Sequence, residues 1–260
     1  MQTISHFIAG LPQLDIHTLS EDWGLATALE NHWQILAESM GLKPSEWLDS
    51  QGDRMYGAVI SLSTAFDLDD PIREDDAIAA ETEFLSIRKP HALSCTRFVV
   101  DGKAKAEIQI LSSFIKRKVR GSNKKFAKVR EIWTAEDVNG DLVDNELDQH
   151  HAMKSLVAEG DLAMEYEVNR IQDFNTADFL YFKNFVRIAK AAEWRQNRSE
   201  PTRLNSRREC WYFGNVEDGA TVLAHVGRDG DACTTVLSDT DGRRLFVSVA
   251  ETPLVSIAER

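Results

Sequence analysis

The sequence predicts an α+β fold in which each of two halves has one long helix and several antiparallel strands. A helical pattern of apolar residues is followed by strand-like runs in residues 1–118, and the same order returns in residues 161–260. In each half an Asp-Gly pair, which favours a tight hairpin turn, separates two of these runs. Helices segregated from antiparallel strands are typical of α+β domains.

The first half begins with a short strand near residues 4–9 and continues with a long helix. Thr18 and Glu21 have the spacing of a capping box, so we expect the helix to begin there. We expect Gly41 to end the helix and Pro44 to start a short further turn. The apolar residues at helical spacing are Trp23, Ala26, Leu29, Trp33, Leu36 and Met40.

Strand-like runs fill the remainder of the first half. They lie at residues 54–66, 77–88, 91–100 and 104–117, and Asp101-Gly102 is the predicted turn between the last two. Residues 119–160 follow, with the acidic, turn-rich stretch "TAEDVNGDLVDNELDQHH". We interpret this segment as the connection between the two halves.

The second half repeats the pattern. A strand at 162–171 precedes a helix at 176–195, and its last two strand-like runs are separated by the Asp241-Gly242 turn. The apolar face of the helix consists of Phe182, Val186, Ala189 and Ala192. The strand-like runs lie at 207–214, 220–227, 231–238 and 243–250.

Equivalent landmarks recur at similar offsets in the two halves. Gly102 and Gly242 differ by 140 positions, and Trp33 and Phe185, each within its long helix, differ by 152. The offset is smaller near the end of each half, so the spacing from helix to strands is longer in the first half. Two copies of a helix followed by antiparallel strands indicate one duplicated fold. A duplicated chain imitates a dimer, so we expect either a monomer with a pseudo-dimeric repeat or a higher homo-oligomer.

Composition excludes several classes of protein. The net charge of −12 argues against a nucleic-acid partner, and no apolar run approaches the ~18–20 residues that span a bilayer. The N-terminal residues lack the basic and apolar regions of a secretory signal. The three cysteines are widely spaced, and neither they nor His150 and His151 have the spacing of metal ligands. We therefore expect a cytoplasmic protein with free thiols and no metal.

One basic segment opposes the acidic balance of the chain. The stretch "KRKVRGSNKKFAKVR" at 116–130 holds eight Lys or Arg residues and no acid. One interpretation is a solvated strand end that runs into a linker. The other is an anion site for the phosphates of coenzyme A or for an acidic carrier protein. Its candidate residues are Lys116, Arg117, Lys118, Arg120, Lys124 and Lys125.

The stretch "DFNTADFLYFKNFVRIAKAAEW" at 173–194 resembles the signature of hot-dog-fold thioester enzymes. It is most similar to the double hot-dog proteins of polyketide and hybrid peptide–polyketide clusters, a group that includes the leinamycin-type bifunctional acyltransferase/decarboxylase. The stretches at 19–41, 54–66 and 207–226 are also similar to that group. The resemblance implies a double hot-dog fold and no tightly bound cofactor. Its implied substrate is an acyl thioester of coenzyme A or of the phosphopantetheine of an acyl carrier protein, and these carriers are the expected partners.

The same resemblance implies a nucleophile. Decarboxylating members acylate a tyrosine and then pass the decarboxylated acyl group to the carrier, and Tyr56 in "RMYGAV" falls at that position. A tyrosine has an ordinary pKa of about 10, so this role requires a nearby cation or strong hydrogen-bond donors. Arg54 points to the same face of a strand as Tyr56 and could supply the cation. The alternative is a tyrosine at a strand end with its hydroxyl in solvent.

Two residues of the quoted stretch are candidates for the chemistry of the acyl carbonyl. Asn175 occupies the position where simple hot-dog thioesterases have an acidic residue. An amide can only form hydrogen bonds to a carbonyl or an enolate, which weakens a plain hydrolytic mechanism there. Alternatively, Asn175 caps the helix together with Thr176 and Asp178. Asp173 could act as a general base or could accept hydrogen bonds from backbone donors of the turn.

His17 precedes the first helix. In hot-dog dehydratases a histidine near this point removes the alpha proton of the substrate, and the alternative here is a surface or capping histidine. The sequence therefore favours acyl transfer, with or without decarboxylation, in secondary-metabolite biosynthesis. A carrier-protein thioesterase and a dehydratase are alternatives. A non-catalytic module that binds an acyl carrier is the alternative of another class, because no unambiguous acid–base pair is present.

Overall fold

The computed structural model describes residues 1–129, 137–156, 160–198 and 203–254, with the side chains of Lys128 and Asn197 left out. The chain divides into two compact units. The first unit comprises Met1–Lys118 and Phe126–Gln149, and the second comprises Val119–Lys125 and His150–Arg260. Among the described residues, no helix has the length and hydropathy needed to cross a membrane.

The first unit is an antiparallel sheet with one long helix against it. Its strands are ordered β1-β3-β4-β5-β2, and the short β6 pairs with β5. Two short 3-10 helices, Leu11–Gln13 and Pro44–Glu46, lie before and after the long helix. The main elements are β1 Gln2–Ile8, α1 Glu21–Met40, β2 Tyr56–Phe66, β3 Ala77–Arg88, β4 His91–Val100, β5 Lys103–Arg117 and β6 Phe126–Lys128.

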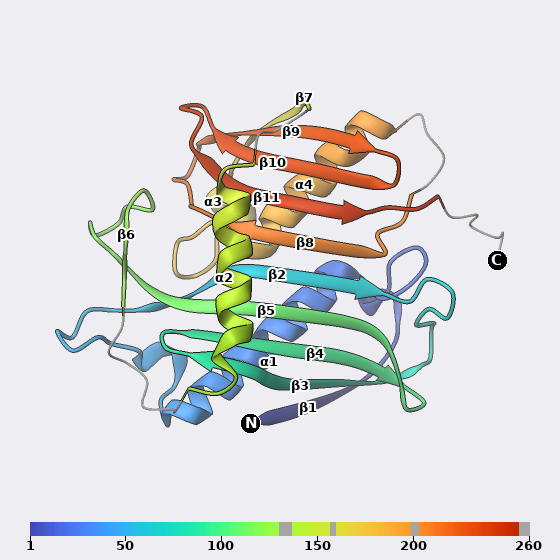
Figure 1. Cartoon of the computed structure of the whole chain (residues 1–260), viewed down its shortest axis with the longest axis horizontal. Coiled ribbons are helices and arrows are strands. Elements are labelled where there is room, and N and C mark those ends of the chain that lie inside the picture. The colour runs from blue at the N-terminus through green and yellow to red at the C-terminus, as the bar shows by residue number, and fades with distance from the viewer. Residues whose placement is uncertain (130–136, 157–159, 199–202, 255–260) are drawn as a thin grey trace. The chain divides into compact units, whose positions relative to one another are not determined.

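The second unit repeats this arrangement. Its strands are ordered β7-β9-β10-β11-β8, again antiparallel, and its long helix α4 also follows the first strand in the chain. In Figure 1, α1 and α4 each lie along one face of the sheet of their own unit. The elements are β7 Asp161–Glu167, α3 Arg170–Asp173, α4 Phe182–Asn197, β8 Arg207–Tyr212, β9 Thr221–Asp229, β10 Ala232–Asp239 and β11 Arg244–Glu251.

The start of α1 differs from the capping box expected from Thr18 and Glu21. Ser20 is the N-cap, and its hydroxyl accepts a hydrogen bond from the amide of Trp23. Glu21 lies inside the first turn, where its carboxylate accepts a hydrogen bond from Thr64 Oγ1 at 3.0 Å. The expected end is confirmed, because Gly41 has φ 63 and closes the helix in the left-handed conformation.

The helix of the second unit begins at Phe182, so the expected start at 176 is wrong. Asp178 has φ 60, a left-handed conformation that interrupts a right-handed helix. Tyr181 is the N-cap and makes no side-chain capping hydrogen bond. The inner face of α4 packs on β7, β9, β10 and β11. Its buried apolar residues are Phe182, Phe185, Val186, Ile188, Ala189 and Ala192.

Most strand boundaries agree with the expected ones. β3 and β4 have the predicted limits, and Asp101 and Gly102 both have positive φ, as a tight two-residue hairpin turn requires. The strand expected at 162–171 instead ends at Glu167. The reason is that Asn169 caps α3, with its side chain accepting a hydrogen bond from the amide of Ile171 at 2.9 Å.

Helix α2, Gly140–Lys154, lies within the segment expected to be a connection and was not predicted. Val143 is its one buried residue among those described, and it packs in the first unit with Leu93 and Leu111. Because so few positions of α2 are apolar and buried, its sequence carries only a weak helical pattern. Residues 130–136 and 157–159 of the same segment lie outside the described part of the chain.

A buried polar cluster lies beneath each long helix. In the first unit His32 on α1 is hydrogen-bonded through both ring nitrogens, to Ser94 Oγ on β4 and to Ser112 Oγ on β5, each at 2.7 Å. Burial lowers the pKa of His32 to about 3, so its imidazole is neutral.

In the second unit Glu193 on α4 occupies the corresponding place. It accepts a hydrogen bond from Thr235 Oγ1 on β10 at 2.9 Å and two from Arg208 on β8, at 2.8 and 2.9 Å. Arg208 also donates to Ser248 Oγ on β11 at 2.7 Å. β10 and β11 hold the sheet positions that β4 and β5 hold in the first unit, so the two clusters are equivalent by position. The first consists of neutral side chains, and the second contains the ion pair of Glu193 and Arg208.

Candidate functional site

Residues 174–181, here called the site loop, connect α3 to α4. A bridge between Phe174 and Leu180 closes the loop. The amide of Asn175 donates to the carbonyl of Phe179 at 2.9 Å, and Asp178 donates its amide to the carbonyl of Asn175 at 2.9 Å. Residues 176–181, which the sequence placed in the helix, thus belong to a compact turn with its own hydrogen bonds.

Asn175 organises this turn and does not cap α4, so the alternative in which Asn175 caps that helix is wrong. Its side-chain oxygen Oδ1 accepts hydrogen bonds from the amides of Ala177 at 3.1 Å and Phe179 at 3.2 Å. With the oxygen committed to the backbone, the NH2 group of Asn175 is the donor left over. Within the described residues this NH2 group has no protein acceptor, and the side chain is partly exposed. Asn175 therefore offers a hydrogen-bond donor and no free acceptor.

Asp173 lies at the base of the site loop and is completely buried. Its carboxylate accepts hydrogen bonds from Asn169 N at 2.8 Å, from the hydroxyl of Tyr166 at 3.1–3.2 Å and from Nη2 of Arg187 at 2.5 Å. Its backbone carbonyl accepts from Tyr181 N at 2.9 Å and from Asn184 Nδ2 at 2.8 Å. Hydrogen bonds to this single residue thus connect β7, α3, the site loop and α4.

Arg187 is the charged partner of this buried carboxylate. Its guanidinium also donates to the Tyr166 hydroxyl at 3.0 Å, and its central carbon lies 5.3 Å from the Tyr166 ring centroid. Burial lowers the pKa of Arg187, but the hydrogen bond to Tyr166 and the charge of Asp173 outweigh it and raise the pKa above its ordinary value. Arg187 stays charged, and its side chain is 45% exposed.

Tyr56 lies in the first unit, at the first residue of β2 and opposite Ile115 of β5. Two guanidinium groups flank its ring, that of Arg54 at 5.6 Å and that of Arg117 at 5.1 Å from the centroid. Both distances are within the range of cation–π interaction. The cation expected from Arg54 is therefore present, and Arg117 adds a second.

His17 is the other candidate of the first unit. It is partly buried, and its Nε2 lies 3.0 Å from the carbonyl oxygen of Leu68. Because a carbonyl oxygen only accepts hydrogen bonds, Nε2 is the donor in this contact.

The basic segment at 116–130 is divided between the two units. The ammonium of Lys116 is bound by the carboxylates of Asp49 at 2.5 Å and Asp53 at 2.9 Å and by Gln51 at 3.2 Å. The hydrogen bonds to Asp49 and Asp53 raise the pKa of Lys116, and the two carboxylates neutralise its charge. Lys116, Arg117 and Lys118 belong to the first unit, and Arg120, Lys124 and Lys125 to the second. Arg130 lies outside the described residues.

The structure thus places the four predicted site residues in two groups. Asp173 and Asn175 are joined by the site loop of the second unit, and Tyr56 and His17 belong to the first unit. In the described part of the chain, no three His, Cys, Asp or Glu side chains gather as metal ligands would.

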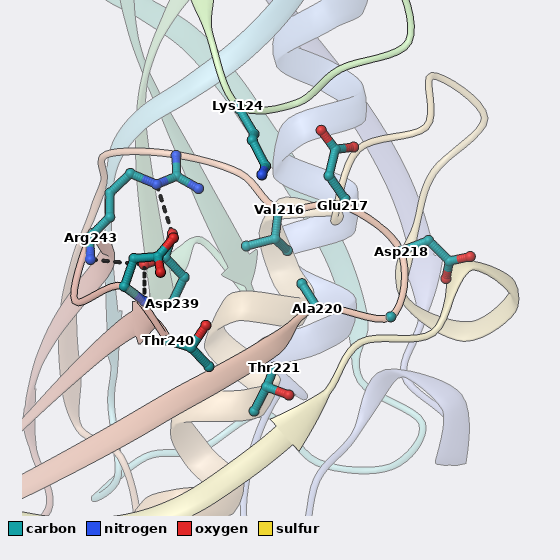
Figure 2. A pocket seen from close by; sticks show the side chains of 11 residues that line it. Lys124, Val216, Glu217, Asp218, Ala220, Thr221, Asp239, Thr240 and Arg243 are labelled. Atoms are coloured by element: carbon teal, nitrogen blue, oxygen red, sulfur yellow. Dashed lines mark hydrogen bonds and ion pairs between the residues drawn. The ribbon is translucent and has the colours of Figure 1, made fainter.

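The second unit has two hollows, and no residue of the site loop lines either of them. Figure 2 shows one of about 340 Å³, where Lys124 reaches toward Val216 and Glu217, and the turn at residues 239–243 forms another wall. The second, about 720 Å³, is lined by residues 167–171 together with Asp218 and Gly219. Arg170, one of its lining residues, forms an ion pair with Asp178 of the site loop at 3.0 Å. Neither hollow is lined by Asp173 or Asn175.

Sequence reasoning missed three residues that hold the site loop. Asn215 makes a paired contact with Leu180, accepting from its amide and donating to its carbonyl, both at 3.0 Å. Asn123 donates to the carbonyl of Asp178 at 2.7 Å. Arg187 is fourteen positions after Asp173. No local spacing marks these contacts, because each joins elements that are distant in sequence.

No protein-family model and no curated protein match this chain. Solved structures do. An acyl-ACP thioesterase from Bacteroides thetaiotaomicron is similar with a TM-score of 0.68 and 12% identity, over 97% of this chain and 98% of that one. The 12:0-ACP thioesterase from Umbellularia californica is similar with a TM-score of 0.68 and 12% identity, over 97% of both chains. The chain has a double hot-dog fold.

The α+β double hot-dog expected from the sequence is therefore confirmed. Each hot-dog unit consists of one long helix and the antiparallel sheet against which it packs. At 12% identity the likeness establishes the fold and not the activity. In this double hot-dog, the second unit has the site loop, and the first has Tyr56 with two guanidinium groups near its ring.

Proposed function

We propose that this protein hydrolyses acyl thioesters carried by the phosphopantetheine of an acyl carrier protein or by coenzyme A. The double hot-dog fold, shared over almost the full chain with two acyl carrier protein thioesterases, supports this function. It corresponds to the carrier-protein thioesterase that the sequence offered as an alternative to acyl transfer.

The observation that carries the proposal is the fixed orientation of Asn175. Two backbone amides hold its oxygen, so its NH2 group is presented as a donor. When a water molecule attacks a thioester, negative charge develops on the carbonyl oxygen, and a fixed donor stabilises that charge. The donor is already ordered in the free protein, so little reorganisation accompanies the reaction. Asn175 is the residue we assign to this role.

Thioester hydrolysis is tested by following release of the free thiol from acyl-carrier-protein and acyl-coenzyme A substrates of several chain lengths. We expect turnover by the wild type and a fall in kcat of about 10²–10³-fold in Asn175→Ala, the usual effect of removing one oxyanion donor. Asn175→Asp has the same shape but lacks the NH2 group, and we expect an equal or larger loss. Thr176→Ala, which changes the exposed neighbour, is the matched control. Absence of turnover by the wild type, or full activity in Asn175→Ala, would refute the proposal.

A second candidate function is acyl transfer through Tyr56, which the resemblance to the leinamycin-type group implies. The observation that favours it is the position of the guanidinium groups of Arg54 and Arg117, which lie 5.6 and 5.1 Å from the centre of the Tyr56 ring. The Tyr56 oxygen would attack the thioester carbonyl of malonyl- or methylmalonyl-coenzyme A, break the C–S bond and release coenzyme A as the free thiol. The acyl group would then lose CO2, and its transfer to the thiol of the carrier would break the tyrosyl ester and restore the phenol.

Intact mass spectrometry after incubation with these thioesters tests acyl transfer. The expected result is a covalent adduct that is lost in Tyr56→Phe and retained in Asn175→Ala. An adduct that persists in Tyr56→Phe would exclude this residue. If the wild type forms no adduct and releases no thiol, the non-catalytic carrier-binding role would remain.

A further inference from the structure

We propose that Asn123 is a positioning residue that fixes the orientation of the Asn175 amide through a single intervening peptide group. The proposal rests on the proposed thioester hydrolysis at Asn175. Asn123 belongs to Val119–Lys125, here called the strap, which is the part of the basic segment that lies in the second unit. The sequence left two interpretations of this segment, a solvated strand end and an anion site. In the structure its buried asparagine contacts the site loop.

The strap is anchored to the second unit by Glu217. The hydroxyl of Ser122 and the backbone amide of Asn123 both donate to Glu217 Oε1, at 3.0 and 2.8 Å. Asn123 is 1% exposed, although the adjacent Lys124 and Lys125 are exposed. A polar side chain this buried requires hydrogen-bonding partners. Nδ2 of Asn123 donates to the carbonyl of Asp178 at 2.7 Å and to that of Val216 at 3.1 Å.

The contact with Asp178 reaches Asn175 through one peptide plane. The carbonyl of Asp178 and the amide of Phe179 belong to the same planar group. Asn123 binds the carbonyl side of this group, and its N–H side donates to Asn175 Oδ1 at 3.2 Å. Rotation of the group would break both hydrogen bonds together. The orientation of the Asn175 amide therefore depends on Asn123, although the two side chains do not touch.

The peptide group needs such support because of its conformation. Asp178 has φ 60, which L-residues with a Cβ disfavour, so the turn is held by its surroundings. Aligned hydrogen bonds also polarise one another, so the chain from Asn123 through the peptide to Asn175 strengthens the NH2 group of Asn175 as a donor.

The rest of the site loop is held independently of Asn123. Asn215 binds both the amide and the carbonyl of Leu180 at 3.0 Å, and Asn184 donates to the carbonyl of Asp173 at 2.8 Å. Loss of Asn123 should therefore release the peptide group between Asp178 and Phe179 while the ends of the loop stay in place. A local change of this kind affects the reaction more than the fold.

The test compares Asn123→Ala with Ser122→Ala, which removes a strap anchor without changing a contact to the site loop. For Asn123→Ala we expect at least a tenfold lower kcat for thioester hydrolysis and less than about a twofold change in KM, because small misplacements of a catalytic group have effects up to about 10²-fold. Hydrogen exchange of the peptide covering residues 174–181 should be faster. Ser122→Ala should leave kcat and exchange unchanged.

A double-mutant cycle separates positioning from general destabilisation. If Asn123 acts through Asn175, the double variant Asn123→Ala/Asn175→Ala should be no slower than Asn175→Ala alone. The proposal would be overturned if the loss of kcat in the double variant equalled the product of the losses in the two single variants. It would also be overturned if hydrogen exchange of residues 174–181 in Asn123→Ala were as slow as in the wild type. If Asn123→Ala does not fold, Asn123→Ser, which retains one donor, is measured with the same expected direction and the same refuting outcomes.

The two proposals fail in different ways. If the wild type hydrolyses thioesters and Asn123→Ala does so at the same rate, the positioning role is refuted and the hydrolytic function stands. If the wild type hydrolyses none, the hydrolytic function and the catalytic part of this inference are refuted, and exchange still measures whether Asn123 fixes the loop.

Discussion

Replacing Asp173 with asparagine tests whether this buried carboxylate is an anchor of the fold. The substitution keeps the shape and one acceptor oxygen, but it places an NH2 group against donors. Wild-type Asp173 is fully buried and accepts from Asn169, Tyr166 and Arg187. The change removes a charge-assisted hydrogen bond of about 1.5–3 kcal/mol and leaves one donor unsatisfied, at about 1–3 kcal/mol.

Solvent reduces the total, because the Arg187 side chain is 45% exposed and can be rehydrated. We therefore expect Asp173→Asn to lower the free energy of unfolding of the second unit by about 2–4 kcal/mol. The corresponding fall in Tm is about 5–15 °C, at about 2–4 °C per kcal/mol for a protein of this size.

Urea unfolding followed by circular dichroism measures this change, with the thermal transition as a second readout. Tyr166→Phe removes a single hydroxyl and should lower the free energy of unfolding by about 1 kcal/mol. Asp231→Asn is the matched control, because Asp231 is 62% exposed in its pair with Arg203 and should contribute less than about 1 kcal/mol. If Asp173→Asn is no less stable than Asp231→Asn, the anchoring role is refuted. Lost hydrolysis at unchanged stability would instead indicate a general base.

Three further predictions concern the first unit and the thiols. Gly57→Ala should destabilise by about 1–3 kcal/mol, because its Cβ would lie 2.5 Å from the Trp33 ring; an unchanged Tm would contradict this. The pKa of His32 is lowered to about 3, below its unfolded value, so the unfolded state binds more protons between these values. Stability should therefore fall as the pH decreases from about 6.5, by up to about 1.4 kcal/mol per pH unit, and His32→Asn should reduce that slope in urea titrations at pH 7 to 4. Burial raises the pKa of Cys95 to about 12 and of Cys233 to about 11, so iodoacetamide should label neither in the folded protein at pH 8; labelling at the rate of the unfolded chain would refute this.

The elements that could be predicted from the sequence are those with a local physical signal. The first half of β3 alternates between buried and more exposed positions, and the Asp101-Gly102 turn marks the end of β4, so these limits were predicted. Gly41 ends α1 because the left-handed C-cap suits a residue without a Cβ. The repeated order of one helix and several strands was visible from such signals alone.

The site loop could not be predicted in the same way. The apolar spacing of Phe179 and Phe182 continues a helical pattern, but Asp178 takes a left-handed conformation that only tertiary contacts reveal. Those contacts come from Asn123 and Asn215, which lie 55 and 35 positions from their partners in the loop. Asn175 was therefore identified as a candidate while its actual hydrogen bonds were not. The acidic helix α2 was missed because Val143 is its one fully buried residue among those described.

The two polar clusters beneath the helices make the halves of this chain non-interchangeable. His32 with its two serines is electrically neutral, whereas Glu193 requires the cation of Arg208 beside it. A chimera with α4 packed on the first sheet would bury the carboxylate of Glu193 without a cation. A chimera with α1 packed on the second sheet would bury the guanidinium of Arg208 without a carboxylate. A redesign that makes the two halves of this chain identical must therefore transplant each helix together with its strand partners.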